Sequence, residues 1–292
     1  MALTSSPSTE QEISIAEQLR RSLGALTPSE RRIARTLLSR YPEVGLGSAG
    51  ELAEASTTSA ATVVRLAQKL GFNGFPDFQA TLRSELSSRL AGPQDRLDRT
   101  GVEQGGVLPT LSGALAATVG SLVETVPDHE FSAAVALLAD QSRRIYLHGG
   151  RLSHSLADLC ANFLARLRPN VSLVSHDPSR RTAQLVEISR RHVLIAFDFR
   201  RYEVDTLSLT KVAAERGAKI IVVTDVLLSP VTANADVVLP VRVEVPSPFD
   251  SSVAALALVE CLALATMQAL GDHGVRRMRA WDEIASNGLV TT

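Results

Sequence analysis

In the first third of the chain, apolar residues recur at the three- and four-residue spacing of amphipathic helices. The segment 27–30 (Thr-Pro-Ser-Glu) is typical of a helix start, because proline is favoured in the first turn and the glutamate can reach back to the N-terminal amides. The glycine at 71 is a typical helix end. The pattern predicts an all-α domain over residues 11–90, with helices at 27–41, 51–55, 59–70 and 72–90.

From about residue 130 the pattern changes to short, continuous apolar runs that alternate with helical segments. Such runs are expected for strands covered by helices on both faces, and their alternation with helices predicts parallel βαβ units in a doubly wound sheet. The predicted strands are 145–148, 171–174, 192–197, 219–224 and 237–241. This α/β domain is predicted over residues 108–285, after a glycine-rich, charged linker at 91–107.

Residues 253–270 are almost entirely apolar, yet Glu260 lies in the middle of this stretch. Because a charge is costly in a lipid bilayer, we predict a helix buried on most sides, against the sheet or a partner subunit, rather than a membrane span. Residues 1–9 lack the charged and apolar segments of a secretory signal, so we expect a cytoplasmic protein.

The composition, with 45% apolar and 21% charged residues, is that of a globular protein, and 292 residues suffice for two domains. The formal net charge is −1, so any nucleic-acid site must be a local basic patch. Cys160 and Cys261 belong to no metal-ligand spacing and are expected to be buried, reduced thiols. The sequence therefore predicts neither a metal nor another cofactor.

A local basic patch lies in the second predicted helical pair, because no acidic residue occurs between Ala55 and Pro76. Ala53 is small enough for two helices to cross, and Val63 and Leu66 would form the inner face of the following helix. Small and hydroxyl residues at a helix N-terminus can approach DNA bases, and two basic residues four positions apart would point the same way. The residues predicted to contact DNA are Thr58, Ser59, Ala61, Thr62, Arg65 and Lys69. The alternative is a plain amphipathic helix in a bundle.

Four stretches resemble the N-terminal domain of RpiR-type transcription regulators. They are 26–34 (Leu-Thr-Pro-Ser-Glu-Arg-Arg-Ile-Ala), 51–53 (Glu-Leu-Ala), 59–66 (Ser-Ala-Ala-Thr-Val-Val-Arg-Leu) and 69–78 (Lys-Leu-Gly-Phe-Asn-Gly-Phe-Pro-Asp-Phe). The resemblance implies a winged or extended helix-turn-helix fold that binds palindromic DNA operators as a dimer. One departure is Thr57 in the turn, where helix-turn-helix units often carry glycine.

In that family the second domain is a sugar isomerase (SIS) domain, a flavodoxin-like, five-stranded parallel sheet that binds a phosphosugar. Residues 217–224 and 228–239 are similar to the family's segments around its last two strands. The ligand loops depart from the family pattern. The first, usually Gly-x-Gly-x-Ser, reads Gly-Gly-Arg-Leu-Ser at 149–153. The second usually carries serines, a glycine and a threonine, and here reads Ala-Phe-Asp-Phe-Arg-Arg at 196–201.

Both loops follow strands, so they are expected at the carboxyl edge of the sheet, where doubly wound folds bind ligands. Arginine suits bidentate recognition of a carboxylate or phosphate, whereas the aspartate in the second loop would repel a phosphate beside it. The residues predicted to bind the ligand are Gly149, Gly150, Arg151, Ser153, Asp198, Arg200 and Arg201. The alternative is that the arginines pair with Asp198, Glu203 or Asp205 and only brace the loops.

The sequence thus predicts a DNA-binding transcription regulator, a homodimer or homotetramer without catalytic residues. A small anionic metabolite, a phosphosugar or a carboxylate, is expected to modulate its operator binding. One alternative is a sugar-phosphate isomerase with a helical N-terminal extension, but isomerisation needs a positioned base, and no acid–base pair is evident in these loops. Another is a dimerisation domain whose pocket binds nothing.

Overall fold

The computed structural model describes residues 14–39, 41–90, 94, 96 and 106–286, and the chain divides into two compact units at residue 88. Most of the predicted linker at 91–107 lies outside the described residues. Each unit has its own hydrophobic core and is considered by itself.

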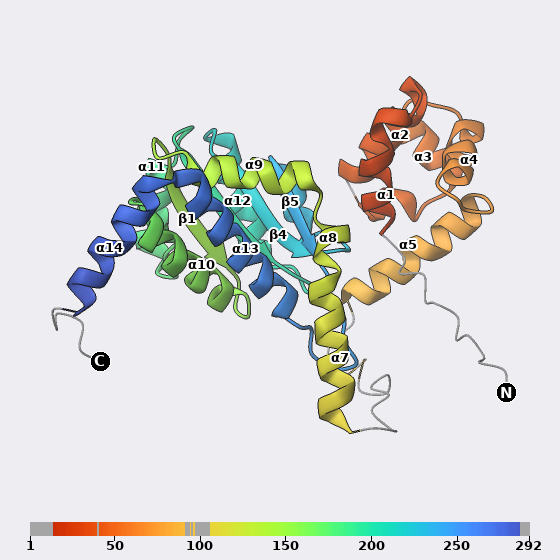
Figure 1. Cartoon of the computed structure of the whole chain (residues 1–292). Coiled ribbons are helices and arrows are strands. Elements are labelled where there is room, and N and C mark those ends of the chain that lie inside the picture. Colours follow the sequence, from red (N-terminus) through yellow and green to blue (C-terminus); the bar gives the residue numbers. More distant parts are fainter. Residues whose placement is uncertain (1–13, 40, 91–93, 95, 97–105, 287–292) are drawn as a thin grey trace. The chain divides into compact units, whose positions relative to one another are not determined.

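The first unit is entirely helical in its described part (Figure 1). Its helices are α1 (Ile15–Ser22), α2 (Pro28–Ser39), α3 (Ala49–Ala55), α4 (Ala60–Lys69) and α5 (Phe75–Leu90), with short 3₁₀ turns at Leu23–Ala25 and Glu43–Gly45. The predicted start of α2 is confirmed. Thr27 N donates to Glu30 Oε2 at 2.8 Å, and Glu30 N donates to Thr27 Oγ1 at 3.4 Å. This reciprocal pair satisfies two amides of the first turn.

The core of the first unit comes from every helix. Side chains with almost no solvent exposure include Ile15, Leu19, Ile33, Leu37, Leu52, Leu66 and Leu82. Short helices such as the seven-residue α3 are not stable alone, so this shared apolar packing supplies most of their stability.

The second unit contains a five-stranded parallel sheet in the order β2-β1-β3-β4-β5, which confirms the predicted fold class. The strands are β1 (Arg144–Gly149), β2 (Val171–Leu173), β3 (His192–Asp198), β4 (Lys219–Asp225) and β5 (Val237–Val241). The helices are α7 (Val107–Gly120), α8 (Leu122–Thr125), α9 (Asp128–Ala139), α10 (His154–Leu167), α11 (Pro178–Glu187), α12 (Val204–Glu215), α13 (Val253–Leu270) and α14 (Asp272–Ser286).

Helices cover both faces of this sheet, as the continuous apolar strands predict (Figure 1). Alternate residues of β3 enter two different cores. Val193, Ile195 and Phe197 pack with α9, α10 and α13, whereas Leu194 and Ala196 pack on the side of α12. The chain leaves β1 towards β2 on one side and continues from β3 to β5 on the other. The order therefore reverses between β1 and β3, and the loops that follow these strands diverge at the carboxyl edge.

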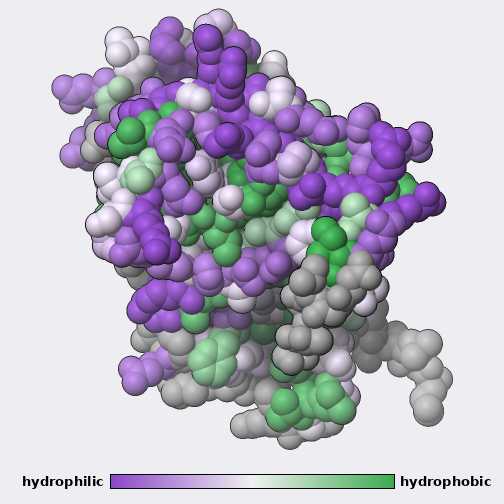
Figure 2. Space-filling model, turned by 90° about the vertical axis from the view of Figure 1, so that its left-hand side faces the viewer, coloured by the Kyte–Doolittle hydropathy of each residue, from purple (hydrophilic) through white to green (hydrophobic). Residues whose placement is uncertain are grey.

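The apolar helix at 253–270 is α13, which packs against α7, α9, α10 and α14. It is less buried than predicted, because Leu264 is exposed, and the expectation that Cys261 is buried is wrong. By length and composition alone, α13 and the stretch 107–125 are apolar enough to cross a membrane, a test that core helices also pass. Figure 2 shows the face on the side of α14 as mainly hydrophilic, with apolar side chains gathered near its centre.

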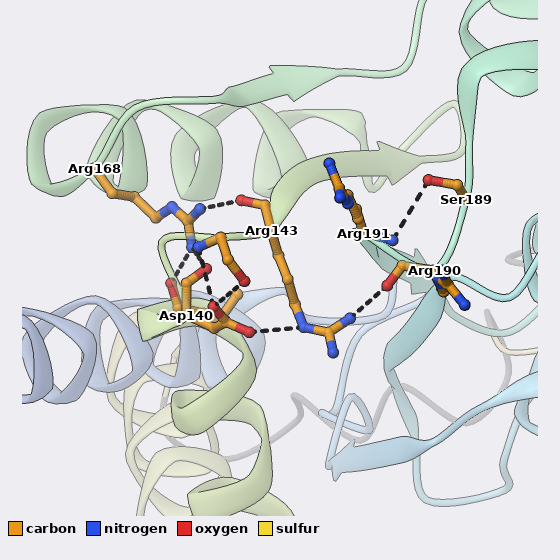
Figure 3. Close-up of polar contacts among 8 residues, drawn as sticks. Asp140, Arg143, Arg168, Ser189, Arg190 and Arg191 are labelled. Atoms are coloured by element: carbon orange, nitrogen blue, oxygen red, sulfur yellow. Dashed lines mark hydrogen bonds and ion pairs between the residues drawn. The ribbon is translucent and has the colours of Figure 1, made fainter.

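The amino edge of the sheet lies opposite the carboxyl edge where the loops after β1 and β3 diverge. At this amino edge, Arg168 is the centre of a buried polar cluster (Figure 3). Its side chain is among the largest that are fully buried, at 1% exposure. The guanidinium donates to four backbone carbonyls: Leu138 O at 2.6 Å, Asp140 O at 2.9 Å, Pro169 O at 3.2 Å and Arg143 O. One side chain therefore connects the C-terminus of α9, the start of β1 and the end of α10.

Candidate functional sites

The turn between α3 and α4 has the geometry of a tight helix–helix connection. Thr58 N donates to Ala53 O at 2.8 Å, and Ser56 Oγ donates to Leu52 O at 2.7 Å. Thr57 has a φ of 53°, in the left-handed region that glycine favours. The sequence departure at this position is therefore a threonine in a glycine-type conformation, which costs a non-glycine residue about 1 kcal/mol.

α4 divides into a buried and an exposed face. Val63 and Leu66 are buried in the first core, as predicted from their spacing. Ala61, Arg65 and Gln68 are exposed and lie one turn apart along the helix, so they form a single stripe. Gln68 was missed in the sequence analysis, although its position three residues after Arg65 on the same face was available from the helical period.

Most predicted hydroxyl contacts are used within the turn itself. Ser59 caps α4 by accepting from Thr62 N at 3.3 Å, and the two hydroxyls lie 2.9 Å apart. Thr58 Oγ1 lies 2.8 Å from Ser56 Oγ, and Arg65 Nη2 donates to the buried Thr62 at 3.2 Å. These side chains therefore set the start of α4 and the direction of Arg65.

Lys69 lies one turn after Arg65 on α4, as its spacing predicts, but its ammonium group is directed towards α2. Its Nζ donates to Ala25 O at 2.9 Å and to Glu30 Oε2 at 3.1 Å, which holds it against α2. The Thr27 amide and then Lys69 lower the pKa of Glu30, and this carboxylate therefore stays charged and attracts the lysine. Glu30, which lies 39 residues earlier in the chain, therefore determines the orientation of the Lys69 side chain.

The second candidate site is a cavity of about 140 Å³ at the carboxyl edge, where the loops after β1 and β3 diverge. Six of the seven predicted ligand residues line it. They are Gly150, Arg151, Ser153, Asp198, Arg200 and Arg201. Gly149 is not a lining residue, but a Cβ there would lie 2.4 Å from Ser153 O, so its lack of a side chain allows the loop to close. Other lining residues had no signal in the sequence: Arg96, Phe249, Asp250 and the two serines that follow.

The loop after β1 is held by Ser153. Its hydroxyl accepts from Gly150 N at 2.9 Å and donates to Phe197 O at 2.8 Å. The carboxylate of Glu203 accepts from Arg151 N at 3.0 Å, and a Cβ on Gly150 would lie 2.6 Å from this carboxylate. Two amides of the loop are thus bonded within the protein, to a hydroxyl and to a carboxylate.

Asp198, at the end of β3, braces the second loop. It accepts from Glu203 N at 3.2 Å through Oδ1 and from the Ser229 hydroxyl through Oδ2. Burial raises the pKa of this carboxyl to about 6, against the lowering effect of these hydrogen bonds. Both oxygens are therefore already bonded within the protein, although the residue lines the cavity.

The three predicted arginines have different environments. Arg200 is 5% exposed and donates through Nη2 to Asp250 at 2.7 Å, with Glu244 at 2.9 Å. Arg151 is 87% exposed, and its Nε lies 3.6 Å from Glu203. Arg201 is exposed and has no ion pair among the described residues, and its φ of 62° is left-handed. The brace alternative thus describes Arg200 and in part Arg151, with Asp250 and Glu244 as partners that the sequence analysis had not proposed.

His148, at the end of β1, lies outside the lining of the cavity. It is buried, with Nε2 3.3 Å from Thr206 Oγ1, and burial lowers its pKa to about 4. This environment is that of a packed, neutral histidine.

Asp225, at the end of β4, is fully buried beside this site. Its Oδ1 accepts from the Tyr202 hydroxyl and from Leu227 N, both at 2.9 Å, whereas Oδ2 has no hydrogen-bond partner among the described residues. Burial raises its pKa to about 6 although Arg200 acts to lower it. Ionisation of Asp225 therefore destabilises the folded state.

We expect Asp225→Asn to stabilise the protein relative to wild type as the pH rises from about 4 to about 7. A carboxyl with a raised folded-state pKa contributes stability below its ordinary value of 3.8, and this contribution is lost as the pH rises through about 6. Asparagine does not titrate, so the variant does not lose this stability as the pH rises. The difference of about two units between the folded-state and ordinary pKa limits its gain in free energy of unfolding over wild type to about 3 kcal/mol. Urea unfolding at a series of pH values measures it.

The exposed Asp282, replaced by asparagine, is the matched control. His148 titrates in the same window in the opposite sense, but it is present in both proteins and cancels in the comparison. If the free energies of unfolding of Asp225→Asn and wild type differed by the same amount at every pH, a raised pKa of Asp225 would be contradicted.

Comparison with known protein families assigns both units. Residues 13–89 match the helix-turn-helix domain of the rpiR family, and residues 137–265 match the SIS domain. Among curated relatives, an uncharacterized HTH-type transcriptional regulator of Haemophilus influenzae is 29% identical over 223 residues, covering 74% of this chain and 75% of that protein. The HTH-type transcriptional regulator HexR of Pseudomonas aeruginosa is 24% identical over 253 residues, covering 85% and 87%.

Solved structures agree on the fold. The Vibrio vulnificus NanR protein, complexed with ManNAc-6P, has a TM-score of 0.56 at 19% identity and covers 94% of this chain and 99% of its own. The sugar isomerase domain of an RpiR transcription factor from Sphaerobacter thermophilus has a TM-score of 0.57 at 21% identity, covering 61% and 98%. With the helix-turn-helix unit first and the SIS unit after it, the chain belongs to the RpiR family of HTH-type transcriptional regulators.

Proposed function

We propose that the protein binds a DNA operator through the exposed stripe of α4, and that a small anionic metabolite in the SIS cavity modulates this binding. The observation that carries the second half is Arg201. It lines the cavity, has no acidic partner among the described residues, and holds a left-handed conformation that costs a non-glycine residue about 1 kcal/mol. Strain kept at an unpaired cation beside a cavity favours a binding role over a structural one.

The metabolite is a phosphosugar or a carboxylate. The NanR neighbour is complexed with ManNAc-6P, which supports a phosphorylated ligand in this fold. In this chain, however, the amides of Gly150 and Arg151 are already bonded and the second loop carries no hydroxyl before Tyr202. Recognition by these two loops would therefore depend on guanidinium groups, which bind carboxylate and phosphate alike.

DNA recognition by this class of protein uses two copies of the reading helix on a palindrome, so we infer a cytoplasmic homodimer or homotetramer. Large apolar side chains that are exposed on the second unit support self-association. They include Val107, Leu108, Val123, Leu264 and Ile284.

An isomerase function has less support. Each carboxylate that lines the cavity already accepts a hydrogen bond or lies in an ion pair: Asp198 with Ser229, Glu203 with Arg151 N, and Asp250 with two arginines. A general base needs a lone pair directed at the substrate.

Replacing Arg201 with glycine is expected to abolish the metabolite response while leaving the DNA affinity of the unliganded protein unchanged. Glycine accepts the positive φ, so the variant should also be about 0.5–1 kcal/mol more stable. A thermal-shift screen of phosphosugars and small carboxylates first identifies a ligand. Operator affinity is then titrated by fluorescence anisotropy with and without it.

The exposed Arg180 of α11, replaced by glycine, removes the same charge outside the cavity and should leave the response intact. A full metabolite response in Arg201→Gly would place the ligand elsewhere.

A further inference from the structure

Arg96 precedes α7, in the segment that leads from the helix-turn-helix unit into the SIS unit, and its side chain lines the cavity. Its Nη1 lies 2.5 Å from Asp250 Oδ1, a residue 154 positions later in the chain. The side chain is only 15% exposed. A residue ahead of α7 is therefore part of the candidate ligand site.

Asp250 is shared by two guanidinium groups. The same oxygen that accepts from Arg96 also accepts from Arg200 Nη2 at 2.7 Å. Arg200 has a second acidic neighbour, Glu244. Two guanidinium groups therefore lie close together at the wall of the cavity. An anionic ligand group would need such a pair of cations.

Arg200 retains unused hydrogen-bonding capacity. A guanidinium has five N–H donors, and the carboxylates beside Arg200 accept only part of them. The buried Nε of Arg200 has no hydrogen-bond partner among the described residues. A buried donor without a partner is costly, so an oxygen-rich anion in the cavity would be stabilised by these groups.

We propose that Arg96 is a ligand-binding residue, which contacts the anionic group of the effector together with Arg200 and is held in place when the cavity is filled. This rests on the proposed function, since it assumes an anion in the same cavity. Binding then restrains Arg96 itself, which lies ahead of α7 in the chain. Effector occupancy thereby acts on the covalent connection to the DNA-binding unit, because a ligand shifts an equilibrium only through contacts that differ between its states.

Inorganic phosphate is the probe, and its affinity for the full chain is measured by thermal shift and calorimetry. We expect Arg96→Gln to weaken phosphate binding about tenfold, since one charged contact is worth about that factor. Asp250→Asn should strengthen binding by a similar factor, because it removes the competing carboxylate. Misfolding cannot produce a gain in affinity, so the second variant separates a binding role from a folding defect.

Trypsin provides a second readout, because it cleaves after arginine. Phosphate should slow cleavage at the Arg96–Leu97 bond in wild type, as followed by mass spectrometry, and Asp250→Asn without phosphate should accelerate it. The matched control is Arg143→Gln, which removes an arginine paired with Asp140 at the amino edge of the sheet and should change neither quantity.

The outcomes separate the two proposals. If Arg96→Gln binds phosphate as tightly as wild type while Arg201→Gly does not bind it, the cavity is the anion site, but Arg96 is only a brace and this inference is wrong. If wild type binds no phosphate, or neither variant changes its affinity, both the inference and the anion site of the proposed function are wrong.

Discussion

Replacing Arg65 and Gln68 together with alanine is expected to weaken specific operator binding by about 2–6 kcal/mol, the sum of about 1–3 kcal/mol for each base-reading side chain. Both lie on the exposed stripe of α4, one turn apart. Arginine pairs bidentately with guanine and glutamine with adenine in the major groove, so each loss removes the discrimination at one position. An operator selected from a random duplex library, titrated with each single and double variant, measures the effect.

Lys69→Ala is the matched control on the same helix. Because its ammonium group is bonded to Ala25 and Glu30, we expect a small loss of stability and little change in the salt dependence of DNA affinity. Non-specific binding should survive in the double variant, since phosphate contacts supply it. Equal losses on all sequences would show that α4 contacts only the DNA backbone.

The second large effect is expected at the amino edge of the sheet, where Arg168→Ala should destabilise the SIS unit by about 3–5 kcal/mol. Four backbone carbonyls lose their donor, and each buried acceptor left without a partner costs about 1–3 kcal/mol before water relieves part of it (Figure 3). The aliphatic part of the side chain is also lost from a fully buried position. Urea unfolding followed by circular dichroism measures the change.

Arg168→Lys keeps the positive charge and much of the packing, but its three donors on one nitrogen do not reach carbonyls on three segments, so we expect it to recover only part of the loss. Arg143→Ala, in the same cluster, is the control for a partly exposed arginine and should cost under about 1 kcal/mol. If Arg168→Ala hardly changed the free energy of unfolding, the four carbonyls would be shown to bind water in place of the guanidinium.

Local order was available from the sequence. The capping pair at the start of α2 lies within four residues, and the inner face of α4 follows from the helical period. The five strands were placed correctly to within a few residues, because apolar runs covered on both faces have little other explanation. The helices α9, α11 and α14 were not predicted, since α9 is apolar on several sides, α11 has no buried residue and α14 buries only Gly274.

The cavity was placed at the correct edge for a topological reason: the loops after β1 and β3 diverge wherever this strand order reverses. Which charged groups face it was not available. Arginine has the same local chemistry at 96, 151, 200 and 201, and what distinguishes these positions is the acidic partner that packing brings near.

Those partners lie far along the chain. Lys69 pairs with a residue 39 positions earlier, Arg200 with one 50 positions later and Arg96 with one 154 positions later. Ion pairs and buried hydrogen bonds act over a few ångströms in space. The number of residues between two partners in the sequence does not indicate whether they come that close. The sequence by itself determined most of the helices, the strands and the edge at which a ligand would lie, because these depend on spacing within one or two elements. Only the tertiary structure decided which guanidinium is braced by an acidic side chain and which is left facing the cavity.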